Sequence, residues 1–255
     1  MDELAIERAE ELLDNPIWSA LTTDHAGLAV GGAHTENQAR RYPEEIGPLS
    51  GMPAETEAGW EALAELAGPG GASGGGVVVL FFRDAPRVPA GWTVVRSGKL
   101  VQMVAERPTA VEITAPAGLT LRKLTAGDVQ AMVELAELTE PGPFRLRTLE
   151  LGTFFGILDG GRLLAMAGKR LHVPGFVEVS AVCTHPEARG RGYARLLMSC
   201  VMEEIVAAGK TPFLHVLKSN AGAIRVYEDL GFRVRRELEF AALTMQGVVT
   251  RQALR

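Results

Sequence analysis

The sequence predicts a mixed α/β fold, in which helices flank a central, mostly antiparallel sheet. Apolar, β-rich runs alternate along the chain with segments whose apolar residues recur at helical spacing, and turn residues separate them. Hydrophobic residues make up 47% of the 255 residues and charged residues 22%, which is typical of globular proteins. A chain of this length can bury a large core without disulfides, in one or two domains.

The first half, residues 1–110, is predicted to be one α/β region. Helical spacing of apolar residues marks three segments: 4–14, 17–21 and 54–66. Strands are expected in four segments: 28–32, 77–82, 92–95 and 100–105. A turn at Ser97-Gly98 would separate the last two strands, and the glycine-rich stretch 68–76 is predicted to be a flexible loop.

The second half, residues 111–255, begins in a segment rich in proline and glycine, 108–118. Helices are expected in three segments: 128–138, which Thr125 can cap, 195–208 and 221–230. Strands are expected in seven segments: 119–124, 154–158, 163–171, 176–183, 212–217, 232–234 and 239–245. Asp159-Gly160-Gly161 favours a hairpin turn, and Gly231 favours a left-handed helix cap.

Charge and composition exclude several classes of protein. Lys and Arg number 26 and Asp and Glu 31, so the net charge of −5 argues against a broad nucleic-acid surface. No apolar run reaches the roughly 18 residues of a membrane span, and the acidic start, 1–14, differs from a signal peptide. Cys183 and Cys200 are too few for a disulfide scaffold, and no Cys/His cluster suggests a metal. We therefore expect a cytoplasmic protein that binds neither membrane, metal nor nucleic acid.

The most informative stretch, 178–194, is a predicted strand that runs into a loop rich in glycine and arginine, which then opens a helix. The amides at a helix N-terminus point outward, and the helix dipole there favours negative charge. Gly190 and Gly192 allow a close backbone approach to a ligand, and Arg189, Arg191 and Arg195 add positive charge. The stretch therefore predicts an anion site, whereas the alternative is a plain strand-to-helix turn with solvated arginines.

Two motifs resemble one known family. Arg189-x-x-Gly192-x-Ala194 resembles the pyrophosphate loop of the GNAT superfamily of N-acetyltransferases. Asn220, Ala223 and Tyr227-x-x-x-Gly231-Phe232 resemble the helix and strand that close the coenzyme A cleft in that family. The resemblance covers 119–245. Thr184-His-Pro and Pro212-Phe-Leu-His215 further resemble the subgroup with a glycine N-acyltransferase-like C-terminal domain.

The resemblance implies an N-acetyltransferase that moves an acetyl group from acetyl-CoA to the primary amine of a small molecule or amino acid. Transfer would be direct, within a ternary complex, and the expected partners are acetyl-CoA and the amine. Two alternatives stay open: a non-catalytic acyl-CoA-binding module, and an acyltransferase for a peptide or protein amine. The first half faintly resembles a degenerate acetyltransferase-like half, and a homodimer is left open.

The resemblance also implies cofactor-binding residues. Backbone groups of Val182, Cys183 and Thr184 would pair with the pantetheine arm. The pyrophosphate would be held by the loop residues Arg189, Gly190, Arg191, Gly192, Tyr193 and Ala194. Asn220 would hydrogen-bond the pantetheine arm, with Ala223 beside it.

Two residues are the candidates for catalysis. Tyr227 resembles the phenol that protonates the departing thiolate, although it could also be a packing residue. Glu178 is the candidate base; the alternatives are His215, no side-chain base, or an inert charge at the strand end. Strand alternation places Glu178 on the face of Val182 and Thr184, with Cys183 on the opposite face.

Overall fold

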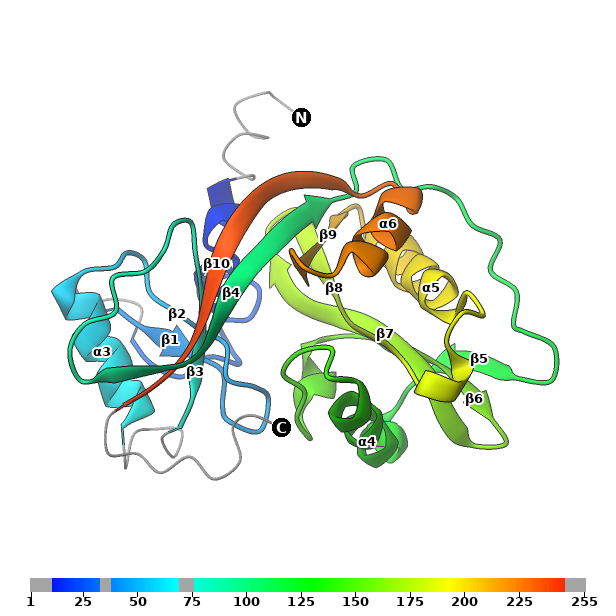
Figure 1. Cartoon of the computed structure of the whole chain (residues 1–255), viewed down its shortest axis with the longest axis horizontal. Helices are drawn as coiled ribbons and strands as arrows, with labels where there is room; N and C mark the ends of the chain where they lie inside the picture. The colour runs from blue at the N-terminus through cyan, green and yellow to red at the C-terminus, as the bar shows by residue number, and fades with distance from the viewer. Residues whose placement is uncertain (1–10, 33–37, 69–75, 246–255) are drawn as a thin grey trace. The chain divides into compact units, whose positions relative to one another are not determined.

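The computed structural model describes residues 11–32, 38–68 and 76–245, and it divides into two compact units (Figure 1). Unit 1 comprises Met1–Leu100, Leu171–Pro174 and Glu237–Arg255, and unit 2 comprises Val101–Arg170 and Gly175–Arg236. Two long strands, β4 (Trp92–Val104) and β10 (Arg233–Met245), contribute residues to both units.

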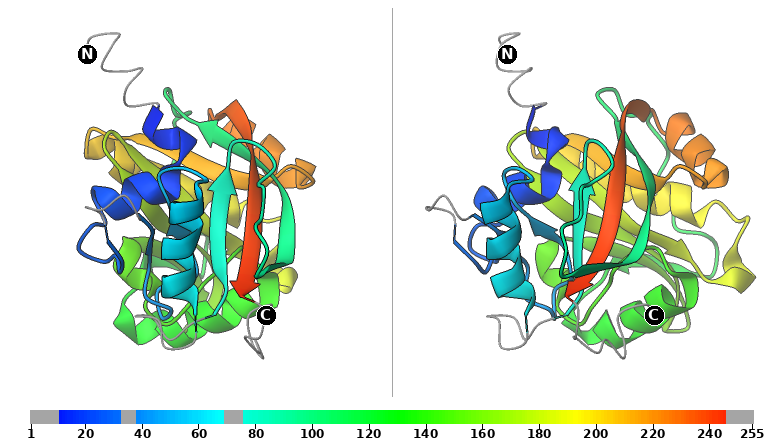
Figure 2. Two further views of the ribbon diagram at one scale, coloured as in Figure 1. Left: turned by 90° about the vertical axis from the view of Figure 1, so that its left-hand side faces the viewer. Right: turned by 60° about the vertical axis from the view of Figure 1, so that its left-hand side comes forward.

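Unit 1 contains an edge strand of the main sheet and a helix that packs beside it. Its helices are α2 (Pro16–Thr22), α3 (Glu57–Ala67) and the 3-10 turn η1 (Leu12–Asp14), and its short strands are β1 (Arg40–Arg41), β2 (Ser50–Gly51) and β3 (Val78–Phe82). Strand β3 pairs antiparallel with β10. Figure 2 shows α3 beside these strands, where Trp60 and Leu63 pack with Leu80 and Leu243. Thr56 caps α3, because its side chain accepts a hydrogen bond from the Gly59 amide.

The sheet of unit 2 follows the neighbour order β10–β4–β9–β8–β7–β6–β5. The five strands not yet located are β5 (Thr120–Lys123), β6 (Phe154–Asp159), β7 (Arg162–Val173), β8 (Phe176–Thr184) and β9 (Thr211–Leu217). The pairs β5–β6 and β6–β7 are antiparallel, whereas β8 and β9 run parallel. The predicted fold class, a mixed α/β fold with a mostly antiparallel central sheet, is confirmed.

Helices cover both faces of this sheet (Figure 1). Helices α5 (Tyr193–Ala207) and α6 (Ala221–Asp229) pack on one face, over a core that includes Leu197, Val201 and Phe232. Helix α4 (Val129–Thr139) packs on the other face, over Phe154 and Met166. The remaining 3-10 turns are η2 (Ala126–Asp128), η3 (Thr148–Leu151) and η4 (Pro186–Ala188). Thr125 and Asp128 form a capping box before α4, where the sequence predicted only Thr125 as a cap.

The structure corrects five predicted strands. The predicted pairs 92–95 with 100–105 and 232–234 with 239–245 are each one continuous strand, β4 and β10. The residues between the predicted segments are mostly polar, exposed at Arg96, Ser97 and Lys99 of β4 but half-buried at Arg235 and Arg236 of β10. The apolar pattern therefore breaks while the backbone pairing continues. The predicted strand 28–32 reduces to a single bridge between Val30 and Arg41.

Three further predictions fall partly outside the described residues or stay untested. Of the predicted helix 4–14, the structure describes only its end, as η1. Most of the predicted loop 68–76 lies outside the described residues. The boundary between residues 110 and 111 stays a prediction, and the compact units divide the chain differently, after Leu100 and again within β7 and β10. No helix in the described ranges is both long and apolar enough to cross a membrane.

Candidate functional site

Strands β8 and β9 run side by side for a short distance only. Their register pairs Phe176 with Thr211, Val177 with Pro212 and Glu178 with Phe213. Both strands then continue, over 179–184 and 214–217, without further pairing to one another in the described structure. We call this parting of β8 and β9 the fork. Their facing backbone groups beyond Glu178 are not used to pair the two strands, and can serve a ligand.

The loop after the fork leads into the N-terminus of α5. Gly190 and Gly192 have φ angles of 76° and 78°, in the left-handed region that favours glycine. Gly192 is the N-cap of α5 and brings no side-chain cap. The first helical hydrogen bond comes from Leu196 to Gly192, so the amides of residues 192–195 have no acceptor among the described residues. These amides point outward, the helix dipole favours negative charge, and the glycines have no side chain to block a ligand. Together they suit the binding of an anion.

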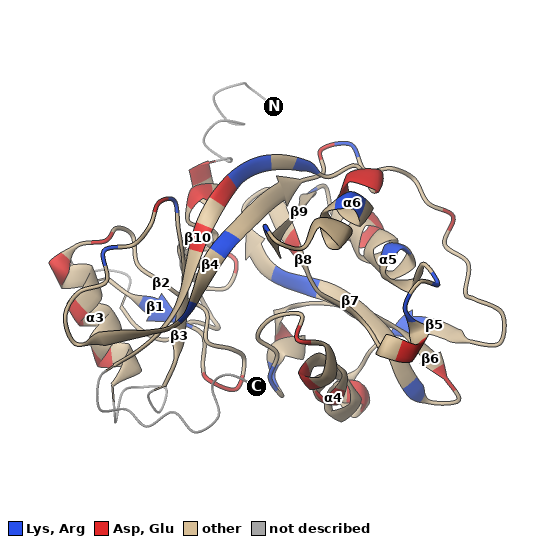
Figure 3. Ribbon diagram, viewed as in Figure 1, with Lys and Arg blue, Asp and Glu red and all other residues tan. Residues whose placement is uncertain are grey.

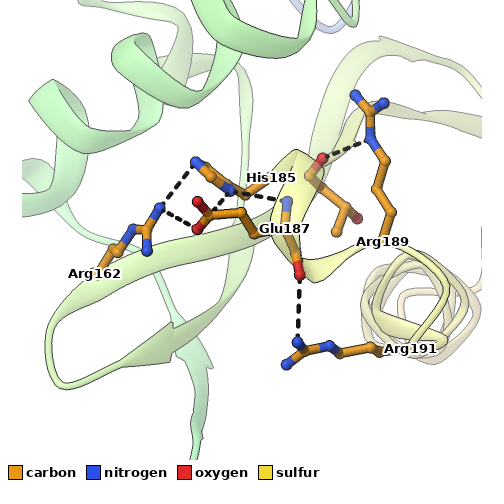
Figure 4. A network of polar contacts seen from close by, with 6 residues as sticks. Arg162, His185, Glu187, Arg189 and Arg191 are labelled. Atoms are coloured by element: carbon orange, nitrogen blue, oxygen red, sulfur yellow. Dashed lines mark hydrogen bonds and ion pairs between the residues drawn. The ribbon is translucent and has the colours of Figure 1, made fainter.

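Side-chain contacts hold this loop in place (Figure 4). Arg162, on the β6–β7 hairpin, donates to His185 Nε2 at 3.0 Å and to Glu187 Oε2 at 2.9 Å. Arg189 donates to the Thr184 carbonyl and Arg191 to the Glu187 carbonyl, each at 3.3 Å. The sequence predicted only positive charge from these loop arginines, whereas the structure also gives two of them backbone contacts that shape the turn.

Tyr227 lies on α6, in the second motif. Its ring packs at an angle against Phe232, with centroids 6.2 Å apart. Burial raises the pKa of Tyr227 to about 12, so the phenol keeps its proton at neutral pH. Packing and a retained proton are both compatible with an acid role.

Asn220 and Ala223 form the start of α6. The Asn220 side-chain oxygen accepts a hydrogen bond of 3.1 Å from the Ala223 amide, and Asn220 is thereby the N-cap. This hydrogen bond uses the Asn220 side-chain oxygen and the Ala223 amide. The side-chain nitrogen of Asn220 is then the group that can bind a ligand.

Glu178 is fully buried at the fork. Arg170 on β7 donates to both carboxylate oxygens, at 2.7 and 2.6 Å, and His215 Nδ1 lies 2.7 Å from Oε1. Burial raises the pKa of Glu178, but the charge of Arg170 and the hydrogen bonds from Arg170 and His215 outweigh it, and the pKa falls to about 2. The carboxylate is therefore ionised, and it is a weak proton acceptor.

The contacts of Glu178 continue across the sheet. His215 Nε2 lies 3.0 Å from Gln102 Nε2 on β4, and Arg235 on β10 donates to Gln102 Oε1 at 2.9 Å. We call the set Arg235, Gln102, His215, Glu178 and Arg170 the polar ladder. Its members come in order from five neighbouring strands, β10–β4–β9–β8–β7. The two ends of the polar ladder lie on β7 and β10, and both strands carry stretches of Lys and Arg (Figure 3).

The structure corrects the predicted faces of β8. Val177, Val179 and Val182 pack in the α5 core, whereas Ala181 and Cys183 pack in the α4 core. The alternation slips by one residue at Ala181, whose φ of 50° is left-handed. Val182 therefore does not share the face of Glu178, and Cys183 does. Cys183 is buried, and burial raises its pKa to about 11, so it stays an unreactive thiol.

Sequence reasoning missed the partners of Glu178. A glutamate inside a predicted buried strand needs a partner, which was the one available signal for Arg170. Nothing in the sequence pointed to Gln102 or Arg235, because they lie far from Glu178 along the chain. Within the ranges that the structure describes, no group of three His, Cys, Asp or Glu residues could hold a metal ion.

Known proteins resemble this chain in sequence and in fold. The family model for FR47-like proteins matches residues 154–241. A GNAT-family crystal structure from Novosphingobium aromaticivorans is 37% identical, with a TM-score of 0.77 over 92% of this chain and 98% of that one. The chain belongs to the GNAT family.

Two further proteins resemble this chain, one over about half of its sequence and one in its fold. A mycothiol acetyltransferase from Thermomonospora curvata is 30% identical over 138 residues, 48% of this chain and 46% of that protein. This chain therefore aligns with about half the length of that curated relative. A GCN5-related N-acetyltransferase from Kribbella flavida shares the GNAT fold, with a TM-score of 0.62 over 91% of this chain and 96% of that one, at 18% identity.

Proposed function

We propose that this GNAT-type acetyltransferase transfers an acetyl group from acetyl-CoA to the primary amine of a small molecule or amino acid. The observation that carries the proposal is the N-terminus of α5, where the amides of residues 192–195 lack an acceptor in the described structure. This N-terminus follows two left-handed glycines and the strand that forms one side of the fork. This arrangement suits a pyrophosphate that continues into an extended arm.

The cofactor would occupy the fork and the loop. The loop from Arg189 to Ala194 would hold the pyrophosphate through backbone amides. Backbone groups of Val182, Cys183 and Thr184 would pair with the pantetheine arm, which suits the unpaired edge of β8. The side-chain nitrogen of Asn220 would add a hydrogen bond to the arm from the start of α6.

Tyr227 is the proposed acid. The amine nitrogen attacks the thioester carbonyl carbon and forms the new C–N bond, the C–S bond breaks, and the thiolate takes the phenolic proton. Tyr227 then regains a proton from solvent. The acceptor's ammonium loses one proton to solvent before the attack, and its nitrogen loses a second to solvent as the amide forms. A phenol that stays protonated at neutral pH is available for this step in each turnover.

For Glu178 we propose an electrostatic role. This differs from the base expected from the resemblance, because a buried carboxylate with a pKa of about 2 and three hydrogen bonds is a poor proton acceptor. His215 is committed to Glu178 and Gln102 in the same way. We therefore propose that the amine reacts after losing its proton to water.

The finer assignments rest on sequence motifs. The glycine N-acyltransferase-like subgroup is proposed on Thr184-His-Pro and Pro212-Phe-Leu-His215. Four further points stay predictions from the sequence: a small amine as the acceptor, a cytoplasmic location, an acetyltransferase-like origin of the first half, and activity without a metal.

A thermal melt with and without acetyl-CoA tests the cofactor, with ATP as the phosphate control. Ligand at one hundred times its dissociation constant adds about 2.7 kcal/mol to the free energy of unfolding. We expect a rise in Tm with acetyl-CoA alone, followed by release of free thiol when the right amine is added. No rise at millimolar acetyl-CoA would contradict the proposal, and binding without thiol release for any amine or peptide would favour a non-catalytic module.

A further inference from the structure

The polar ladder crosses the sheet where β8 and β9 part. Glu178 and Phe213 form the last register pair, and His215 lies two residues further along β9. His215 nevertheless contacts Glu178 through its side chain, at 2.7 Å. A side-chain bond thus joins the two strands beyond the end of their backbone pairing.

The donors in the ladder point in one direction. Arginine can only donate, so Arg235 makes Gln102 Oε1 an acceptor and turns Gln102 Nε2, a donor, toward His215. His215 Nε2 must then accept, which leaves the proton of the imidazole on Nδ1. From there it is donated to Glu178, whose ionised carboxylate also accepts from Arg170. Each member fixes the orientation of the next.

Burial makes this order costly to break. The side chains of Glu178 and His215 are 1% and 2% exposed, and Gln102 is fully buried. A buried donor that faces another donor loses its hydrogen bond without gaining one from water. A rotated Gln102 amide or the other His215 tautomer would create such a clash, so a single arrangement is favoured.

We propose that Gln102 and Arg235 are positioning residues, which fix the tautomer of His215 and thereby brace the fork between β8 and β9. The expected effect on cofactor binding rests on the proposed function, because the fork is where the acyl-CoA arm is proposed to bind. Arg235 and Gln102 act through His215 and would not touch the reacting atoms. Their loss would loosen the fork and weaken cofactor binding more than it slows transfer.

The first test reads the His215 tautomer by long-range ¹H–¹⁵N correlation NMR, with the signal assigned from its loss in His215→Asn. We expect a proton on Nδ1 in the wild type. Glu178→Gln should keep this tautomer, because Gln102 still donates to Nε2. Glu178→Gln combined with Arg235→Met should show both tautomers, because the Gln102 amide can then rotate.

Either of two results would overturn the proton order: mixed tautomers in Glu178→Gln alone, or an unchanged single tautomer in the double variant. Should Glu178→Gln not fold, Gln102→Glu offers a second test. It places an acceptor against Nε2, so a proton should appear on that nitrogen. Its absence would likewise contradict the order.

The second test is kinetic and uses Arg235→Met, with Arg235→Lys as the conservative control. We expect KM for acetyl-CoA to rise about 3- to 10-fold in Arg235→Met, kcat to stay within about twofold, and Arg235→Lys to recover most of the KM. An unchanged KM, or an equal loss of kcat, would contradict the positioning role. If the wild type does not bind acetyl-CoA, the proposed function fails, whereas the NMR test still decides the proton order.

Discussion

Gly192 and Gly209 lie just outside the two ends of α5 and have nearly the same positive φ angle, 78° and 70°. A Cβ at either glycine would meet no atom within 4 Å. The need for glycine therefore comes from the left-handed backbone and not from crowding. The two positions differ in one respect that matters for function, because only Gly192 belongs to the proposed anion loop.

This pair gives a matched test of the loop. Gly192→Ala and Gly209→Ala should each lower the free energy of unfolding by a similar amount, about 1–2 kcal/mol. Only Gly192→Ala should weaken acetyl-CoA binding, by about 10-fold, because a strained loop presents its amides less well. Isothermal titration and urea unfolding measure the two effects. Equal affinity in both variants would argue against the loop as the pyrophosphate site.

Tyr227→Phe should separate chemistry from binding. The ring and its packing on Phe232 are kept, so Tm and the KM for acetyl-CoA should stay close to those of the wild type. Loss of the acid should lower kcat about 100-fold, within the usual range for a general acid. Steady-state assays of thiol release measure this, and an unchanged kcat would remove Tyr227 from the acid role. Because the pKa of Tyr227 is raised to about 12, ionisation of this phenol should cause no fall in kcat below pH 10.

Glu178→Gln should destabilise the protein in a pH-dependent way. The pKa of Glu178 is depressed in the fold, so its ionised form stabilises the protein above the unfolded-state pKa, and this contribution is lost as pH falls through about 2. A shift of this size corresponds to a contribution on the order of 3 kcal/mol at pH 7.

Urea unfolding of the wild type and Glu178→Gln at two pH values measures this effect. The gap in free energy of unfolding should narrow by about 1 kcal/mol between pH 7 and pH 4, because the unfolded carboxylate takes up a proton first. A gap that is constant across this range would mean that the Glu178 pKa is not depressed in the fold.

Arg162→Met should show how far the contacts of Arg162 order the loop before the cofactor binds. Arg162 ties the β6–β7 hairpin to His185 and Glu187 through exposed contacts, which contribute little to overall stability. We expect Tm to change by no more than a degree or two, while KM for acetyl-CoA rises about threefold. Arg147→Met, which breaks an exposed pair with Glu150 that includes no residue of the loop, is the control and should leave both quantities unchanged. A parallel change in the two variants would contradict a specific role for Arg162.

Local patterns in the sequence predict much of this fold. Helices α3, α4, α5 and α6 and the hairpin of β6 and β7 follow from periodicity and turn residues, because short-range interactions determine them. The continuity of β4 and β10 was missed, since backbone pairing continues through their polar middle residues and leaves no trace in the apolar side-chain pattern.

The candidate site divides in the same way. The glycine loop and the Tyr227 motif are contiguous, so the sequence displays them. The face of Cys183 was mispredicted because one left-handed residue, Ala181, shifts the alternation of β8. The ladder joins residues up to 133 positions apart, Gln102 and Arg235, and only the sheet order brings them together.

The shared strands β4 and β10 have a consequence for dissecting the protein. A fragment comprising residues 111–255 would keep the GNAT motifs but would lack β4, the strand beside β9. Strand β9 would then become an open edge with unsatisfied amides, able to pair with other chains. Gln102 would be lost as well, and His215 would face water. Such a fragment should aggregate on expression, so we expect that residues 111–255 do not fold as an autonomous module.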